Sequence, residues 1–214
     1  MKQKEKIQVI AEIGILSAIA VILDFLFGLI PVFPWGGSIS PAMLPIFVIA
    51  YRHGVKAGLL SGFAFAILQI IVMLAVGQVF PEVNLLAAAA GADTFGPTWL
   101  KVVMVILLDY LIPFTLLGFA GLFKNALSNV KAFVLGMVVA SFFRYIMHGL
   151  SGVLVWGSYT AWFNEEFHTN VSPFVYSFLI YNLTYMVGSL VFCIFVGLVL
   201  FKRNLLTVNL NQKG

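Results

Sequence analysis

Three ionisable residues lie inside long apolar stretches of this sequence, where a charged side chain needs a specific reason to be present. They are Asp109, Arg144 and His148. Placing such a group in hydrocarbon costs at least about 2.5 kcal/mol, so it normally faces the interior of a helix bundle or a polar cavity. The three residues therefore indicate a polar site inside a membrane-embedded protein.

Arg144, His148 and Ser151 follow the spacing i, i+4, i+7, which puts them on one face of a helix. For Arg144 we favour a structural role as the partner of a carboxylate, for which Asp109 is a candidate. For His148 we favour contact with a ligand, because it lies nearer the end of its apolar stretch and two turns from Trp156. A proton relay usually needs a chain of titrating groups, and one carboxylate at this depth does not make such a chain.

Asp109 and Tyr110 put a carboxylate and a phenol in the middle of an apolar stretch. A buried carboxylate can bind a cation or accept two hydrogen bonds from an amino-heterocycle, and aromatic faces can bind a heteroaromatic ring or a delocalised cation. Further aromatic and amide side chains lie at a similar depth in other stretches: Trp156, Tyr176, Tyr181 and Asn182. This set predicts a site for an organic cation or an aromatic heterocycle, with Asp24 as a candidate at its border. A metal site is not expected, because one histidine and no paired carboxylates lie at this depth.

The composition places these residues in a membrane protein. The chain of 214 residues is 62% apolar and 9% charged, whereas soluble domains carry about 25% charged residues. Its net charge of +4 fits basic residues gathered in cytoplasmic loops, so we expect no nucleic-acid partner. No phosphate-binding loop ending in Lys-Ser or Lys-Thr is present, so any ATP hydrolysis would belong to another subunit. We expect no cofactor.

The apolar stretches predict an all-α polytopic membrane protein, with residues 1–214 forming a single integral membrane domain. One membrane crossing takes about 20 residues, and the predicted architecture is a bundle of six transmembrane helices. The expected helices cover about residues 7–30, 41–51, 55–79, 99–123, 132–156 and 173–201. Residues 77–97 form an insert between the third and fourth of them.

Lysine and arginine lie almost entirely on one side of this predicted topology. The basic loop residues of that side are Arg52, Lys56, Lys124 and Lys131, and the acidic residues of the opposite loops are Glu82, Asp93, Glu165 and Glu166. Basic loops are cytoplasmic, so we expect both termini in the cytoplasm and a cavity that opens outward from the cell membrane. The four tryptophans fall at the outer ends of the helices, as interfacial anchors do, and we include Trp35 among the predicted ligand-binding residues.

Four segments of the sequence resemble the thiamine-binding S components of energy-coupling-factor (ECF) vitamin transporters. The segments are residues 36–58, Asp109-Tyr110 with the apolar run after it, residues 144–159 and residues 176–182. The resemblance implies a six-helix bundle with a vitamin pocket in its outer half. It also implies docking on a shared transmembrane subunit and two cytoplasmic ATPase subunits, with no catalytic activity of the chain itself.

Taken position by position, the resemblance implies roles for individual residues. The positions that match the family's ligand-binding residues are Asp109, Tyr110, His148, Trp156, Tyr176 or Tyr181, and Asn182. The small-residue motif through which the family's first helix contacts the transmembrane subunit falls on Gly14 and Ala18. These two residues have the small-xxx-small spacing that lets a neighbouring membrane helix approach closely. Thiamine would offer its aminopyrimidine to the carboxylate and amide, and its thiazolium cation to the aromatic faces.

The sequence departs from the family at three places, and other functions therefore stay open. Asp109 stands where the family usually has glutamate, Gly14 where it usually has alanine, and residues 77–97 are longer than expected. Because outer loops close such pockets, a thiamine precursor or another vitamin is an alternative ligand. A stand-alone proton-coupled carrier would use Asp109 as its titrating residue. An intramembrane enzyme would use His148 with Asp109 or Glu82, although the sequence holds no visible nucleophile arrangement.

Overall fold

The computed structural model describes residues 3–30, 32–79, 97–126, 129–203 and 206, and the regular structure within them is helical. The helices in chain order are α1 (Gln3–Gly28), α2 (Leu44–His53), α3 (Val55–Val79), α5 (Thr98–Val105), η2 (Ile106–Leu111), α6 (Ile112–Leu116), η3 (Leu117–Gly121), α7 (Asn129–Leu154), α8 (Gly157–Glu166), η4 (Val175–Asn182) and α9 (Leu183–Lys202). Of these, η2 and η4 are π-helices and η3 is a 3-10 helix. The insert predicted at 77–97 lies mostly outside the described residues.

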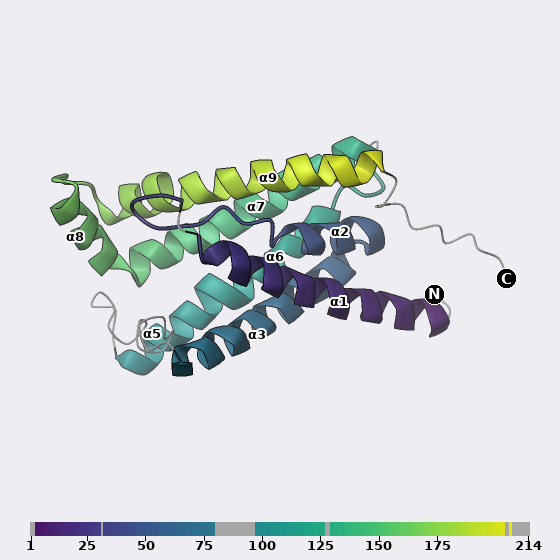
Figure 1. The fold of residues 1–214 in the computed structure, drawn as a ribbon, viewed down its shortest axis with the longest axis horizontal. Helices are drawn as coiled ribbons and strands as arrows, with labels where there is room; N and C mark the ends of the chain where they lie inside the picture. Colours follow the sequence, from purple (N-terminus) through teal and green to yellow (C-terminus); the bar gives the residue numbers. More distant parts are fainter. Residues whose placement is uncertain (1–2, 31, 80–96, 127–128, 204–205, 207–214) are drawn as a thin grey trace.

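Five of the helical stretches are long and apolar enough to cross a membrane. They are Gln3–Gly28, Val55–Gly77, Thr98–Gly121, Asn129–Leu154 and Val175–Lys202. The helices lie lengthwise beside one another, and the N-terminal end of α1 is at the same end of the bundle as the C-terminal end of α9 (Figure 1). The opposite end carries α5 and α8. The predicted all-helical, polytopic architecture is confirmed.

The helix expected at residues 41–51 is a short core helix, α2. Its ten residues rise by about 15 Å, which is half the thickness of the hydrocarbon core. Ile46, Phe47 and Ile49 in its middle are fully buried, and Gly54 just past its end has a φ of 89°, which favours glycine. Residues 32–43 before it are not helical. A sixth crossing therefore cannot be made by α2 alone, and would need residues 32–53 acting together.

Glycines bring α3 into backbone contact with its neighbours. A Cβ added at Gly62 would lie 2.1 Å from the carbonyl oxygen of Phe114, and one added at Gly58 would lie 2.8 Å from the Cα of Gly118. Small residues four apart allow this close approach between membrane helices. The result is a dense layer of α2, α3, α6 and η3, in which Phe65 and Phe114 meet edge to face at 4.7 Å.

Glu12, Arg52 and His53 form a group of paired charges at the α2 end of the bundle. Glu12 of α1 forms ion pairs with Arg52 and with His53, the latter at 2.7 Å between Oε2 and Nε2. Lys124, in the segment after η3, donates a hydrogen bond to the carbonyl oxygen of Arg52. These contacts join α1, the end of α2 and the segment after η3. Charge pairing therefore stabilises this end of the bundle in addition to packing.

The two π-helices lie in the spans that carry most of the predicted site. Asp109 and Tyr110 belong to η2, and Tyr176, Tyr181 and Asn182 belong to η4. A π-helix bonds residue i to i+5, so residues five apart share a face, and such turns occur frequently at functional sites. Tyr176 and Tyr181 are five apart, and their ring centroids are 6.1 Å from each other. The wider turn thus presents two tyrosines side by side.

Candidate ligand-binding site

A cavity of about 960 Å³ lies among α1, α3, η2, α7, α8 and η4. Its lining includes residues of α8, which places it toward the end of the bundle opposite the chain termini (Figure 1). The structure brings to this one cavity every residue predicted from the sequence to contact a ligand: Trp35, Asp109, Tyr110, His148, Trp156, Tyr176, Tyr181 and Asn182. These residues come from three of the long helical spans, from the junction between α7 and α8, and from the segment after α1, and they meet around a single space.

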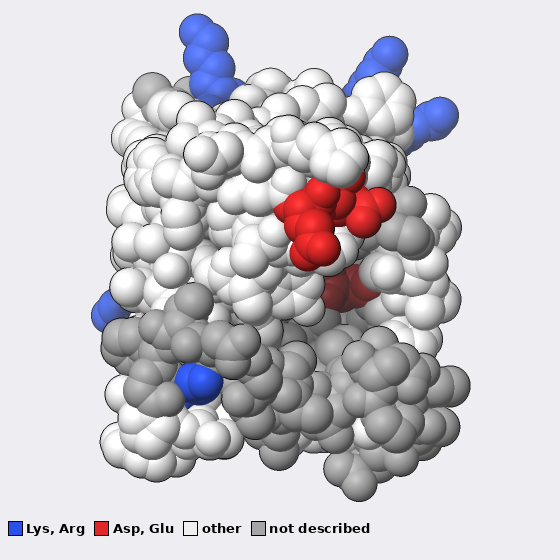
Figure 2. Space-filling model, turned by 90° about the vertical axis from the view of Figure 1, so that its left-hand side faces the viewer, with Lys and Arg blue, Asp and Glu red and all other residues white. Residues whose placement is uncertain are grey.

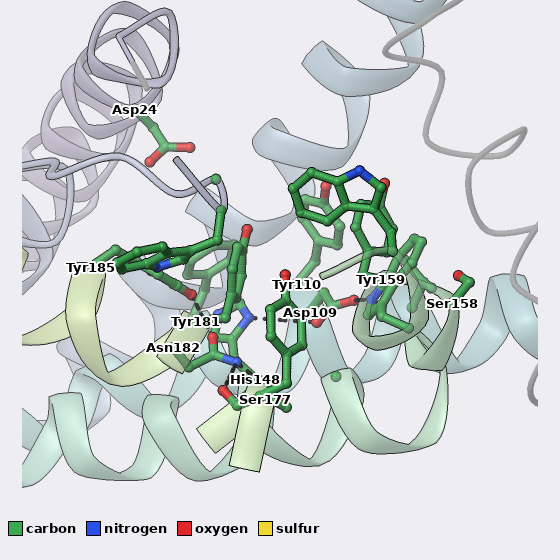
Figure 3. Close-up of a pocket in the computed structure, with 18 of the residues that line it drawn as sticks. Asp24, Asp109, Tyr110, His148, Ser158, Tyr159, Ser177, Tyr181, Asn182 and Tyr185 are labelled. Carbon is green, nitrogen blue, oxygen red and sulfur yellow. Dashed lines mark hydrogen bonds and ion pairs between the residues drawn. The ribbon is translucent and has the colours of Figure 1, made fainter. Parts of the chain in front are cut away.

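Asp109 is the centre of a hydrogen-bonded group on one wall of the cavity (Figure 3). Its Oδ2 accepts a hydrogen bond of 2.9 Å from the indole nitrogen of Trp156, and its Oδ1 lies 3.5 Å from Nδ1 of His148. Each carboxylate oxygen can accept two hydrogen bonds, so both oxygens keep a free lone pair. The carboxylate is thereby held in one orientation and can still accept from a ligand.

Arg144 reaches Asp109 through His148 and not directly. Its Nε donates to Nε2 of His148 at 3.2 Å, and its guanidinium carbon lies 4.9 Å from the ring centroid of Phe114. Because Nε2 accepts this bond, the imidazole proton belongs on Nδ1, where it faces the carboxylate. The direct pairing of Arg144 with Asp109 considered from the sequence is thus replaced by a chain in which arginine fixes the tautomer of the histidine.

A row of tyrosines from η4 and α9 forms another wall. The ring centroids of Tyr181 and Tyr185 are 5.4 Å apart, and those of Tyr176 and Tyr181 are 6.1 Å apart. Trp35, in the non-helical segment after α1, joins this wall and donates from its indole nitrogen to the hydroxyl of Thr184 at 3.4 Å. Aromatic faces of this kind bind flat rings and delocalised cations.

Asn182 has most of its hydrogen-bonding capacity used within the protein. Its Nδ2 donates to the carbonyl oxygen of Ser177 at 2.9 Å, and its Oδ1 accepts from the hydroxyl of Tyr185 at 2.9 Å. The Ser177 hydroxyl in turn donates to the carbonyl oxygen of Gly149 on α7 at 2.9 Å. Asn182 therefore holds the π-turn and Tyr185 in place and has one Oδ1 lone pair left for a ligand.

Several lining residues were not among those predicted. Gln69, Tyr159, Ser177 and Tyr185 line the cavity, and so does Asp24, which the sequence placed only at its border. Gln69 could have been found, because an amide side chain is as conspicuous in the apolar third span as a charged one. Tyr185 could also have been found, because it follows Tyr181 by four residues, a spacing that puts both side chains on one face of a helix.

The charge of the cavity is one-sided. Asp24 and Asp109 line it, and among the described residues no lysine or arginine does. Seen from the α8 end, the surface is mostly uncharged, and acidic atoms are visible both at the surface and recessed within a hollow (Figure 2). A cavity with two carboxylates and several aromatic faces favours a positively charged organic ligand over an anion.

Comparison with known proteins agrees with this chemistry. A model of the thiamine transporter protein family (Thia_YuaJ) matches residues 10–92 and 85–209. The chain is 35% identical over 211 residues to the thiamine transporter ThiT of Bacillus subtilis (strain 168), and the alignment covers 94% of each chain. It is 28% identical over 174 residues to the thiamine transporter ThiT of Lacticaseibacillus paracasei, covering 74% of this chain and 73% of that protein.

A solved structure of ThiT from Listeria monocytogenes has the same fold. The two structures superpose with a TM-score of 0.67 at 21% identity, covering 93% of this chain and 96% of that one. With the apolar helices described above, these matches make the protein a multi-pass protein of the cell membrane. The chain belongs to the thiamine transporter protein family.

Proposed function

We propose that this chain is the substrate-binding S subunit of an ECF importer and that thiamine, captured in the cavity, is its cargo. One observation carries the proposal: Asp109 is held between His148 and Trp156 on one wall of a cavity that has several aromatic faces on its other walls. Thiamine combines an aminopyrimidine, which donates hydrogen bonds to a carboxylate, with a thiazolium ring, which carries a permanent positive charge. The two halves of the vitamin match the two kinds of wall.

The site residues have distinct roles in this proposal. Asp109 accepts from the aminopyrimidine through its free lone pairs, and Trp156, fixed by its bond to Asp109, supplies a ring face for stacking. Tyr176 and Tyr181 supply the faces against which the thiazolium cation rests. The protein forms no covalent bond with the vitamin and carries out no reaction, because binding and release are all that an S subunit contributes.

The energy for uptake comes from partners in this proposal. Two cytoplasmic ATPase subunits and a transmembrane subunit form the rest of the importer, and α1 offers a surface for docking. Gly14 and Ala18 are exposed on α1, and a Cβ added at Gly14 would meet nothing within 4 Å. An open small-residue surface of this kind suits close packing by a helix of another subunit.

The topology proposed for this function has six crossings and both termini in the cytoplasm. Residues 32–53 make the sixth crossing together, part non-helical and part α2. The shared position of the first and last helix ends (Figure 1) supports the even number of crossings. The gathering of Arg52, Lys56 and Lys124 near that end supports its cytoplasmic assignment. The cavity then opens to the outside, where the vitamin is captured.

The test is a tryptophan-fluorescence titration of the detergent-purified protein with thiamine, with riboflavin and biotin as controls. Trp35 and Trp156 line the cavity, so a bound vitamin quenches them. We expect saturable quenching by thiamine and none by the other two vitamins. Equal responses to all three, or none to thiamine from a folded sample, would overturn the proposal. Thiamine uptake by liposomes that contain this chain alone and a pH gradient would favour a proton-coupled carrier instead.

A further inference from the structure

Asp24 and Gln69 form a second polar group that lines the cavity. Gln69 of α3 donates from Nε2 to Oδ2 of Asp24 on α1. Figure 3 shows Asp24 apart from Asp109, with tyrosine side chains between them. The cavity therefore has two separate polar positions, each built around a carboxylate.

Gln69 has an acceptor atom that nothing in the described structure uses. The residue is 4% exposed, and its Oε1 is buried with no hydrogen-bond partner among the described residues. The orientation of the amide is set, because a carboxylate accepts and so requires Nε2 on its side. Buried polar atoms are nearly always hydrogen-bonded, so an unpaired one in the lining of a cavity points to a donor supplied by a ligand.

A positive charge, Arg144, lies on the side of this group that faces away from the large cavity. Arg144 attracts Asp24 electrostatically, and the two residues line a smaller cavity of about 190 Å³ together with Ser38, Ser40 and Ser189. Asp24 lines both cavities, whereas Arg144 lines the smaller one and not the larger. The side of the group that faces the large cavity thus presents acceptors and negative charge, while the compensating cation lies on the other side.

We propose that Asp24 and Gln69 form an acceptor subsite that binds the hydroxyl group of thiamine, so that the cavity selects the free vitamin over its phosphate esters. This inference rests on the proposed function, since it assigns the end of thiamine that Asp109 does not bind. A hydroxyl donates one hydrogen bond and satisfies the free Oε1. A phosphate ester has no proton to donate at that position at neutral pH and brings negative charge toward Asp24.

The experiment compares three ligands on the purified full chain: thiamine, thiamine monophosphate, and an analogue in which the hydroxyethyl group is replaced by ethyl. We expect the wild type to bind thiamine about tenfold or more tightly than either other ligand, the effect of one hydrogen bond to a charged or buried group. Gln69→Leu should weaken thiamine by a similar factor and leave the affinity for the ethyl analogue unchanged. Unchanged binding of the analogue also shows that the variant is folded.

Ser151→Ala is the matched control, because the Ser151 hydroxyl is likewise buried without a partner among the described residues but does not line the cavity. It should leave all three affinities unchanged. If the wild type binds thiamine but binds the monophosphate equally well, or if Gln69→Leu weakens thiamine and the analogue alike, the subsite is overturned and the proposed function stands. If the wild type binds no thiamine, the proposed function fails and the subsite fails with it.

Discussion

The two ends of this molecule use polar side chains in opposite ways. At the α2 end, Glu12 is paired with Arg52 and His53, and glycines on α3 bring backbones into contact. At the α8 end, carboxylates line an open cavity, and Gln69 has an unpaired oxygen. The carboxylate at the first end holds helices together, whereas those at the second face open space. An unpaired buried atom is not enough to mark a binding site, because Arg52 Nε and the Ser151 hydroxyl are also unpaired among the described residues and line no part of the cavity. Polar side chains mark a site in this membrane protein where they border a cavity.

Four substitutions test this contrast, because those at the α2 end should change stability and those at the α8 end should change affinity. The largest effect is expected from Gly62→Val in the dense layer. The new Cβ would lie 2.1 Å from the carbonyl oxygen of Phe114, which as a backbone atom cannot move aside, so we expect a loss of more than about 3 kcal/mol. Size-exclusion chromatography and thermal melting should show no folded protein.

Gly14→Val provides the matched control for this substitution. A Cβ at Gly14 meets nothing within 4 Å, so the isolated protein should melt within a few degrees of the wild type. The same variant should fail to assemble with the transmembrane subunit, because α1 would no longer present a small-residue surface. If Gly62→Val melted like Gly14→Val, the description of this layer as backbone-to-backbone packing would be wrong.

Asp109→Asn should lower the affinity for thiamine about a hundredfold, which corresponds to about 2.7 kcal/mol. Asparagine retains an acceptor for the Trp156 indole but loses the charge and one acceptor position. Calorimetric titration measures the affinity, and a melting curve should stay close to that of the wild type. Glu165→Gln removes an exposed carboxylate on α8 and should change neither. Equal losses in both variants would mean that overall charge, and not Asp109, attracts the vitamin.

Glu12→Gln should have the converse outcome. Arg52 and His53 would lose their carboxylate, and we expect a destabilisation of about 1–3 kcal/mol, seen as a lower melting temperature. Thiamine affinity should be unchanged, because Glu12 is at the far end from the cavity. A change in affinity without a change in melting temperature would show that the two ends are coupled.

The smallest effect is expected from Trp156→Phe. Phenylalanine keeps an aromatic face but cannot donate to Asp109, whose orientation then depends on His148 alone. We expect affinity to fall by about fivefold, or roughly 1 kcal/mol, with little change in stability. Because this variant removes a fluorophore from the cavity, calorimetry is the appropriate measurement. A loss as large as that of Asp109→Asn would make the indole nitrogen, and not the ring, the important feature.

The number of residues between a side chain and the outer end of its apolar stretch was enough to predict that Asp109, His148 and Tyr181 lie near one another. Asp109, His148 and Tyr181 lie in three different spans, and counting residues from one membrane face placed them at one level; the structure brings them to one cavity. Counting assumes a regular rise, which holds across long helices. The lengths and ends of the apolar stretches also located the five long spans to within a few residues.

What the sequence could not predict depends on irregular backbone and on contacts between distant segments. An α-helical count does not put Tyr176 and Tyr181 on one face, and the π-helix does. Residues 157–166 were expected as part of an outer loop and form α8. The hydrogen bond from Gln69 to Asp24 joins residues 45 positions apart, and no local pattern encodes it.

The binding site depends on the number of residues in η2 and in η4, the two π-helices. Removing a single residue from η2 would allow the span to close into a regular α-helix, and each residue in an α-helix turns the chain by about 100°. The deletion would turn the part of the span before it relative to the part after it. Either Asp109 would leave the cavity, or the side chains of α6 and η3 would lose their present packing partners. Hydrophobicity and span length would hardly change, so the protein would still insert. A one-residue deletion there would therefore remove binding with almost no change in composition.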